Sequence, residues 1–194
     1  MRKLLVCLLF LTGTARAGVI TPFISEIHYD NTGADIAEFV EITGSGMDLS
    51  GWVLRFYNGA TGTIYDSMSL TGILAGEALS SLAFFPGFSL QNGSPDGLAL
   101  IAAGGDVVEF LSYEGSFTAS DGEAAGLTST VLPARETGST PVGYALQRLS
   151  LDGTGWEVAE ATPGVVNTAH IPLPPPLGLL FAGLWAISRA RRSV

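Results

Sequence analysis

Between Gly18 and Asn167 the chain has no convincing stretch with the 3.6-residue periodicity of a helix. Its apolar residues instead alternate with polar residues over short runs, and glycine-containing turns separate these runs. Such period-two spacing of β-branched and aromatic residues is typical of strands that bury one face. About seven to nine short strands with regular turns predict an all-β fold of the β-sandwich type.

The clearest strands lie in residues 24–42, with the sequence ISEIHYDNTGADIAEFVEI. Apolar Ile27 and Tyr29 alternate with Glu26 and His28, and a second alternating run follows at Phe39. Residues 30–35 between the two runs are rich in turn-forming side chains. We therefore expect two half-buried strands joined by a capped turn.

The second half of the chain has fewer clear strands. Residues 144–149 form the last distinct alternating run, and residues 156–158 form a weaker one. Residues 116–140 are small and polar and contain several glycines, without the spacing of a strand. We predict that this stretch is a long surface excursion.

The charged residues are distributed unevenly. The chain has 9 basic and 18 acidic residues, and three basic residues lie near each terminus. The middle of the chain therefore carries a net charge of −15 and has only three basic residues: Arg55, Arg135 and Arg148. Nucleic-acid binding needs a basic footprint, so we predict no nucleic-acid partner. Solubility explains the acidity, and calcium or a cationic partner is the alternative.

The N-terminus has the three parts of a secretory signal peptide. Arg2 and Lys3 precede an apolar run over residues 4–11, and Ala15-Arg16-Ala17 matches a cleavage site. The apolar run is much shorter than the ~20 residues that span a bilayer. We predict a signal peptide over residues 1–17, with cleavage between Ala17 and Gly18.

The C-terminus has the pattern of a second targeting signal. Residues 169–176 form a proline-rich linker, and residues 177–187 are apolar. We predict a short hydrophobic helix that begins at residue 177 and belongs to an anchor over residues 177–194. Terminal arginines favour a cytoplasmic end. The proposed sorting motif consists of Pro172, Leu173, Pro174, Pro175 and Pro176. The basic residues at the end of the proposed anchor are Arg189, Arg191 and Arg192.

This tripartite tail resembles the PEP-CTERM class of bacterial sorting signals, in its VPLPA-type variant. The motif here is IPLPPP, so Ile171 and Pro176 depart from the usual valine and alanine. The resemblance implies an exosortase-type sorting enzyme as a partner and a Gram-negative host. It also implies a product in the cell envelope or outside the cell, with the C-terminal segment transiently in the inner membrane.

The middle of the chain resembles the lamin-tail domain. The resemblance depends first on residues 24–42 and on Asp48-Leu-Ser-Gly-Trp52. It also depends on the hairpin residues 96–100 and 107–110 and on the closing segment of the domain, Ala161-Thr-Pro-Gly-Val-Val-Asn167. It implies an immunoglobulin-like β-sandwich over residues 18–168. The family also implies a non-catalytic interaction module.

Oxygen donors gather in the first turn. Asp30, Asn31, Asp35 and Glu38 are hard ligands within nine residues, and calcium takes six to eight such oxygens. Their spacing does not match an EF-hand loop. Turn capping by Asp30 and Asn31 explains the same residues without a metal. Calcium is the one cofactor that the sequence suggests.

Catalytic patterns are weak. His28 stands near Asp30, but the other histidine, His170, lies in the C-terminal linker, and the domain has few basic residues. We therefore predict no enzyme activity. Trp52 is expected in the core rather than in a glycan-stacking site. Phe84, Phe85 and Phe88 are candidates for an exposed patch.

These observations predict an exported, envelope-sorted β-sandwich that acts as a structural or protein-interaction module. The alternative is a calcium-dependent adhesin or glycan-binding module of the extracellular matrix. The partner is expected to be an envelope or extracellular protein or glycan.

Overall fold

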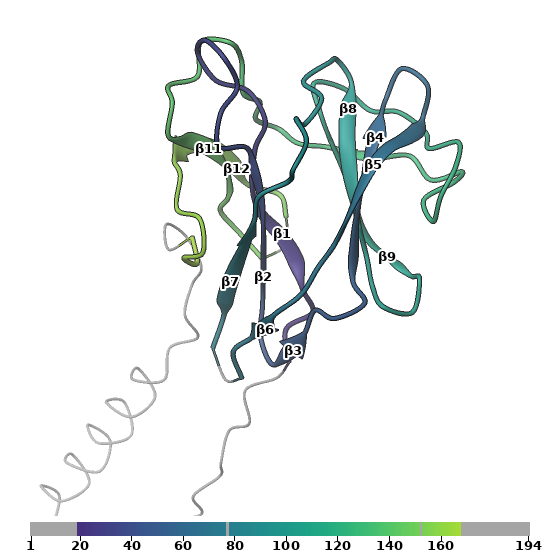
Figure 1. The fold of residues 1–194 in the computed structure, drawn as a ribbon, viewed down its shortest axis with the longest axis vertical. Helices are drawn as coiled ribbons and strands as arrows, with labels where there is room; N and C mark the ends of the chain where they lie inside the picture. The colour runs from purple at the N-terminus through teal and green to yellow at the C-terminus, as the bar shows by residue number, and fades with distance from the viewer. Residues whose placement is uncertain (1–18, 77, 152, 168–194) are drawn as a thin grey trace, which may run out of the picture.

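The computed structural model describes residues 19–76, 78–151 and 153–167 (Figure 1). These residues form strands and turns, with no helix among them, so the predicted all-β class is confirmed. Nine of the strands have five or more residues, which agrees with the number expected from the sequence. In chain order the strands are β1 (Phe23–His28), β2 (Phe39–Gly44), β3 (Met47–Asp48), β4 (Val53–Asn58), β5 (Thr63–Ser69), β6 (Ile73–Leu74), β7 (Ser80–Phe84), β8 (Asp96–Ile101), β9 (Val107–Tyr113), β10 (Thr130–Val131), β11 (Tyr144–Arg148) and β12 (Trp156–Glu160).

Two five-stranded sheets face each other (Figure 1). The first has the order β12-β11-β1-β2-β7, and the second has the order β10-β9-β8-β4-β5. A small third sheet pairs β3 with β6. Side chains from both large sheets meet in one core, which includes Ile27 and Ile42 from the first sheet and Leu54 and Leu100 from the second. This arrangement is a β-sandwich.

Strands β1 and β2 form the predicted antiparallel pair. Ile24 lies opposite Ile42, and Glu26 lies opposite Glu41, with a β-bulge between Ile24 and Glu26. The bulge adds Ser25 to the outer face beside Glu26, and the isoleucines stay in the core. The strand pair is therefore apolar on its inner face and polar on its outer face.

The outer face of this pair is not exposed, which corrects the expectation of half-buried strands. Glu26 and Glu41 are both fully buried. Backbone N–H groups of Thr162 and Gly164 donate hydrogen bonds to these two carboxylates. Residues 161–167 thus cover the polar face of β1 and β2, so both faces of the pair are buried.

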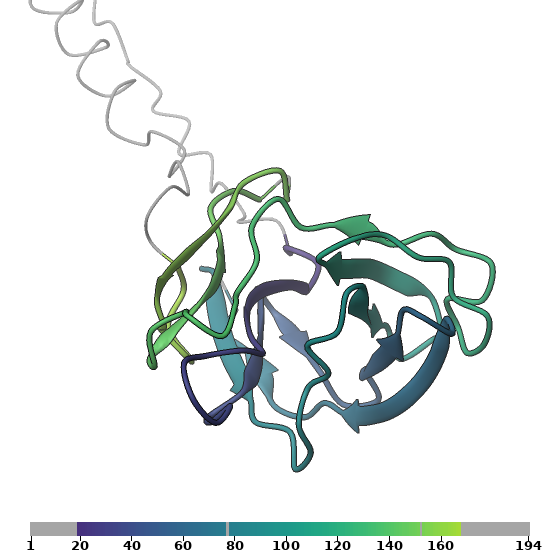
Figure 2. The ribbon, with the colours of Figure 1, turned by 90° about the horizontal axis from the view of Figure 1, so that it is seen from above.

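Residues 116–140 are also more ordered than expected. They run over the surface, as Figure 2 shows in green, and several of their apolar side chains are buried, whereas Leu127 and Val131 stay exposed. Phe117, Ala119 and Ala124 pack on Tyr57 and Phe110, on the face of the second sheet that points away from the main core. Farther along the chain, β10 pairs in parallel with β9. The prediction of a surface excursion is therefore only partly right, because the stretch forms a second, smaller core.

Several predictions concern residues outside the described ranges. These are the signal peptide over residues 1–17 with its cleavage after Ala17, the sorting motif over residues 172–176, and the anchor over residues 177–194. Within the described ranges, no helix has the length and hydropathy that are needed to cross a membrane.

Candidate functional site

The turn between β1 and β2 is held by the side chain of Asn31. Its Nδ2 donates to the carbonyl oxygens of Thr32 at 3.1 Å and Ala34 at 3.0 Å. Its Oδ1 accepts the backbone N–H of Ile36 at 3.1 Å. The carboxylate of Asp35 accepts the backbone N–H of Asn31 at 3.2 Å. The turn is therefore capped from within, as the sequence predicts.

The four proposed calcium ligands are only partly brought together. Partial burial raises the pKa of Asp30, and the charge of the nearby Asp35 raises it further. Asn31 uses its side-chain oxygen within the turn, and Glu38 binds a backbone N–H of another segment. In the part of the chain that the structure describes, no three His, Cys, Asp or Glu side chains are arranged to hold a metal ion. The geometry favours turn capping as the role of Asn31.

Next to this turn lies a groove of about 370 Å³, which we call the Phe85 groove. Asp35, Ala37 and Glu38 from the β1–β2 connection form one side. Residues 85–89, which follow strand β7, form the other side. An acidic wall and an aromatic wall therefore face the same space.

The aromatic wall has a fixed part and an exposed part. The ring of Phe88 is partly buried and packs edge-on against Phe56 of the core, with 5.1 Å between ring centroids. Phe85 is 59% exposed, and its ring lies 5.7 Å from that of Phe39. Phe84 is partly buried against the core. Of the three candidates for an exposed patch, the structure therefore exposes Phe85.

Glu38 is the most unusual residue of the acidic wall. The side chain is only 9% exposed, and its Oε2 accepts the backbone N–H of Leu90 at 2.7 Å. Its Oε1 is buried and has no hydrogen-bond partner among the residues described. Burial raises the pKa of this carboxyl, and the nearby charge of Asp35 raises it further. Burying a carboxylate with a hydrogen-bond donor on only one of its two oxygens costs free energy, so Glu38 marks this groove as a candidate binding site.

His28 lies in a different, closed environment. Its Nδ1 is 2.8 Å from Oε1 of the fully buried Glu136. The other oxygen of Glu136 accepts the backbone N–H groups of Tyr29 at 2.6 Å and Asp30 at 3.0 Å. Burial alone lowers the pKa of His28, but the hydrogen bond and charge of Glu136 outweigh it and raise the pKa. The pair therefore ties residues 116–140 to the end of β1, and it is shielded from solvent.

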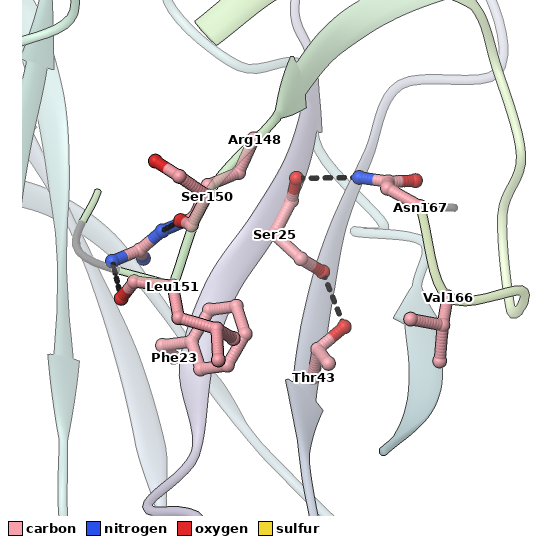
Figure 3. Close-up of a pocket in the computed structure, with 8 residues that line it drawn as sticks. All are labelled: Phe23, Ser25, Thr43, Arg148, Ser150, Leu151, Val166 and Asn167. Atoms are coloured by element: carbon pink, nitrogen blue, oxygen red, sulfur yellow. Dashed lines mark hydrogen bonds between the residues drawn. The ribbon is translucent and has the colours of Figure 1, made fainter. Parts of the chain in front are cut away.

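The outer face of β1 and β2 carries a second closed polar network. Ser25 donates to Oε1 of Glu41 at 2.7 Å, and Thr43 donates to Ser25 at 2.7 Å. Asn167 donates to the carbonyl oxygen of Ser25 at 2.9 Å (Figure 3). Burial raises the pKa of Glu26 to about 7, and the neighbouring Glu41 contributes to this rise. The network holds residues 161–167 in place.

One arginine joins the two large sheets. Nη1 of Arg148 lies 2.7 Å from Oε1 of Glu109, which belongs to the opposite sheet. The same guanidinium donates to the carbonyl oxygens of Ser150 and Leu151 (Figure 3). It also lies over the ring of Phe23, 4.6 Å from its centroid. These contacts use its donors within the protein, so Arg148 has a structural role.

Trp52 lies in the core, as the sequence predicts. It is 6% exposed and belongs to the main hydrophobic cluster between the sheets. A ring that stacks on a sugar must be exposed at the surface. Trp52 therefore does not provide the stacking surface that the glycan-binding alternative needs.

Sequence reasoning missed the three buried carboxylates Glu26, Glu41 and Glu136. The first two stand at central strand positions where exposed residues are expected, and the third lies in a polar, glycine-containing stretch. One signal was present: two glutamates on paired strands need donors, and the backbone N–H groups of Thr162 and Gly164 supply them from the far end of the domain.

We compared the chain with models of protein families, with curated proteins and with solved structures, and none of them matches it.

Proposed function

We propose that this chain is an exported, non-catalytic β-sandwich of the lamin-tail type that serves as a protein-interaction module of the bacterial envelope. The observation that carries this proposal is that charged side chains are buried and form hydrogen bonds inside the fold. Glu26, Glu41 and Glu136 are fully buried, and each accepts hydrogen bonds from the protein's own backbone. A catalytic acid or base must reach its substrate, and these groups do not.

The lamin-tail assignment is supported by how its motifs meet. The sequence Glu38-Phe-Val-Glu-Ile42 and the closing sequence over residues 161–167 are far apart in the chain. They contact each other through the hydrogen bond from the backbone N–H of Gly164 to Oε2 of Glu41, at 2.8 Å. Residues shared with a family through a common fold are expected to be those that hold the fold together. This contact therefore supports the resemblance and the immunoglobulin-like topology that it implies.

The interaction role is supported by the Phe85 groove. The informative feature is the buried carboxylate of Glu38, which lines the same groove as the exposed ring of Phe85. The aromatic side chain gives a partner an apolar contact, and the acidic wall gives the contact specificity. We therefore place the partner-binding face at this groove.

Photo-crosslinking on the displayed full chain tests the interaction role. A photoreactive residue is introduced at position 85, and in matched controls at the exposed positions 73 and 142. We expect position 85 to capture one envelope component reproducibly. An absence of crosslinks from all three positions would overturn the proposed role.

The proposed sorting to the cell surface is tested separately. Deletion of residues 177–194 is expected to abolish surface display, whereas replacement of the exposed Val165 by alanine is expected to leave display unchanged. Normal display of the truncated chain would contradict sorting through the C-terminal signal. Conversion of a substrate by the purified chain, with loss of that activity on Glu136→Gln, would contradict the non-catalytic assignment.

A further inference from the structure

The Phe85 groove has carboxylates that form no ion pair among the described residues, although the charge of His28 acts on Glu38 from within the protein. Asp35 and Glu38 both line it. Three ion pairs occur among the described residues, and they use the acidic residues Glu109, Glu123 and Glu136. No arginine within the described ranges is therefore paired with Asp35 or Glu38. A positive group from another molecule fits this charge.

Glu38 is prepared to accept such a group. Its Oε2 is occupied by the backbone N–H of Leu90, which fixes the orientation of the carboxylate. Its Oε1 has no donor in the described structure, although the side chain is nine-tenths buried. Because Glu38 is part of the groove wall, a cation bound in the groove would approach its carboxylate. Charges interact strongly at short range where water is excluded, so the cation would offset the cost of burying the carboxylate.

Asp35 reinforces the negative wall without being neutralised. Its Oδ1 accepts the backbone N–H of Asn31, and its Oδ2 accepts Nδ2 of Asn92 at 3.2 Å. Both donors are neutral groups, so they hold the carboxylate in place and leave its charge. The acidic wall is therefore fixed before a ligand binds.

The aromatic wall selects the shape of the cation. Phe88 is packed on Phe56 and Tyr65 and is therefore held in place, whereas Phe85 is exposed at the rim. A small metal ion gains nothing from aromatic rings in this position and prefers a shell of oxygens. A basic side chain gains on both walls, because its apolar stem packs on the rings and its charged head reaches the carboxylates. Guanidinium also stacks on aromatic faces and pairs with carboxylates through two parallel hydrogen bonds.

We propose that the Phe85 groove binds a basic side chain, arginine in preference to lysine, presented by an extended segment of a protein partner. This inference rests on the proposed function, since it names the chemistry of the partner at the face where that function places binding. The charge of −15 in the middle of the chain would attract a basic segment from a distance and hasten its association.

The test uses the full chain labelled with ¹⁵N and titrated with capped pentapeptides, Gly-Gly-Xaa-Gly-Gly. The central residue is arginine, lysine or citrulline, which has the shape of arginine without its charge. We expect the arginine peptide to shift the backbone amide signals of residues 37–38, 85 and 87–89. We expect weaker shifts with lysine and none with citrulline.

Two variants test how much each wall of the groove contributes to the affinity for the arginine peptide. Phe85→Ala removes an exposed ring and is expected to weaken arginine binding by about two- to fivefold. Glu38→Gln keeps the shape of the side chain and removes its charge, and it is expected to weaken binding by about tenfold. The matched control is Glu157→Gln, which removes one exposed carboxylate elsewhere and is expected to change affinity less than about twofold.

Three results would overturn the inference: equal binding of the arginine and citrulline peptides, shifts that map to another face, or unchanged affinity in both groove variants. Calcium chloride that reproduces the same shifts and displaces the peptide would also overturn it, by assigning the groove to a metal. Failure here leaves the proposed function standing if crosslinking captures a partner from position 85. Peptide binding without any crosslinked partner would support the groove chemistry and contradict the envelope role.

Discussion

Glu26 and Glu41 are direct cross-strand neighbours at the centre of the first sheet, and both are fully buried. Like charges directly opposite each other on two strands destabilise a sheet. This pair is tolerated because Thr162 and Gly164 donate backbone N–H groups to the two carboxylates, one to each. The raised pKa of Glu26, about 7, reflects its burial first and the charge of Glu41 second.

We predict that the protein is more stable at pH 5.5 than at pH 8. The folded-state pKa of Glu26 lies above its ordinary value of 4.5, so the folded protein keeps a proton that the unfolded chain releases between pH 4.5 and about 7. The free energy of unfolding therefore falls as the pH rises through this window, by about 2 kcal/mol from Glu26 between pH 5.5 and pH 8. His28 acts in the same direction, because its raised pKa stabilises the fold at low pH and this stabilisation is lost as the pH rises. Urea denaturation of the full chain at the two pH values measures the difference.

The control for this prediction is Glu26→Gln. The amide has the shape of the protonated acid and cannot ionise, so the variant should lose the part of the pH dependence that comes from Glu26 and be more stable than the parent at pH 8. An equal or greater stability of the parent chain at pH 8 than at pH 5.5 would contradict the prediction.

Asn167→Ala is expected to destabilise the fold by about 1–3 kcal/mol. The change removes the donor to the carbonyl oxygen of Ser25 and the acceptor that Thr162 uses at 2.7 Å. Chemical denaturation gives the loss of stability, and hydrogen exchange of the Gly164 amide reports the loosening of residues 161–167. Val165→Ala changes a side chain that is 60% exposed in the same segment and should stay within about 0.5 kcal/mol. Similar losses from both substitutions would argue against a specific role for Asn167.

Glu136→Ala is expected to cost about 3–5 kcal/mol. The substitution leaves the backbone N–H groups of Tyr29 and Asp30 and the ring of His28 without their acceptor in a buried place. Equilibrium unfolding measures the loss. The matched control is Glu157→Ala, which removes an exposed carboxylate and should stay within about 0.5 kcal/mol. A cost below 1 kcal/mol for Glu136→Ala would show that residues 116–140 are not fastened through this carboxylate.

Two aromatic substitutions should separate core from surface. Trp52→Ala empties a buried position and is expected to cost about 3–5 kcal/mol, whereas Phe85→Ala removes a mostly exposed ring and should cost less than about 1 kcal/mol. Thermal and urea unfolding of both variants give the comparison. If the two costs were equal, the distinction between a core tryptophan and a surface phenylalanine would be wrong.

Local patterns were sufficient to predict the strands. Alternation over residues 144–149 predicts a strand, and β11 spans Tyr144–Arg148. The capped turn over residues 30–35 follows in the same way from the preference of Asn31 for bonding its own backbone. These features depend on neighbours in sequence, so a single chain is sufficient to predict them.

Burial by distant segments could not be predicted in this way. The face that Glu41 occupies is polar by pattern, and it is buried only because residues 161–167 lie on it. Glu136 is a lone carboxylate in a stretch without periodicity, and nothing local marks it as buried. The exposure of Phe85 depends on where β7 ends and on its register with β2, in which Phe84 lies opposite Val40. Register between strands is a tertiary property.

The hydrogen bond between Asn167 and Ser25 joins positions 142 residues apart. Contacts of such long sequence separation form slowly, because much of the chain must be brought together before they contribute. A chain that is still being synthesised cannot complete the outer face of β1 until residue 167 has left the ribosome. The first strand of the sandwich is thus among the last to be finished, and a chain that stops before residue 161 is left with two glutamates lacking their backbone donors.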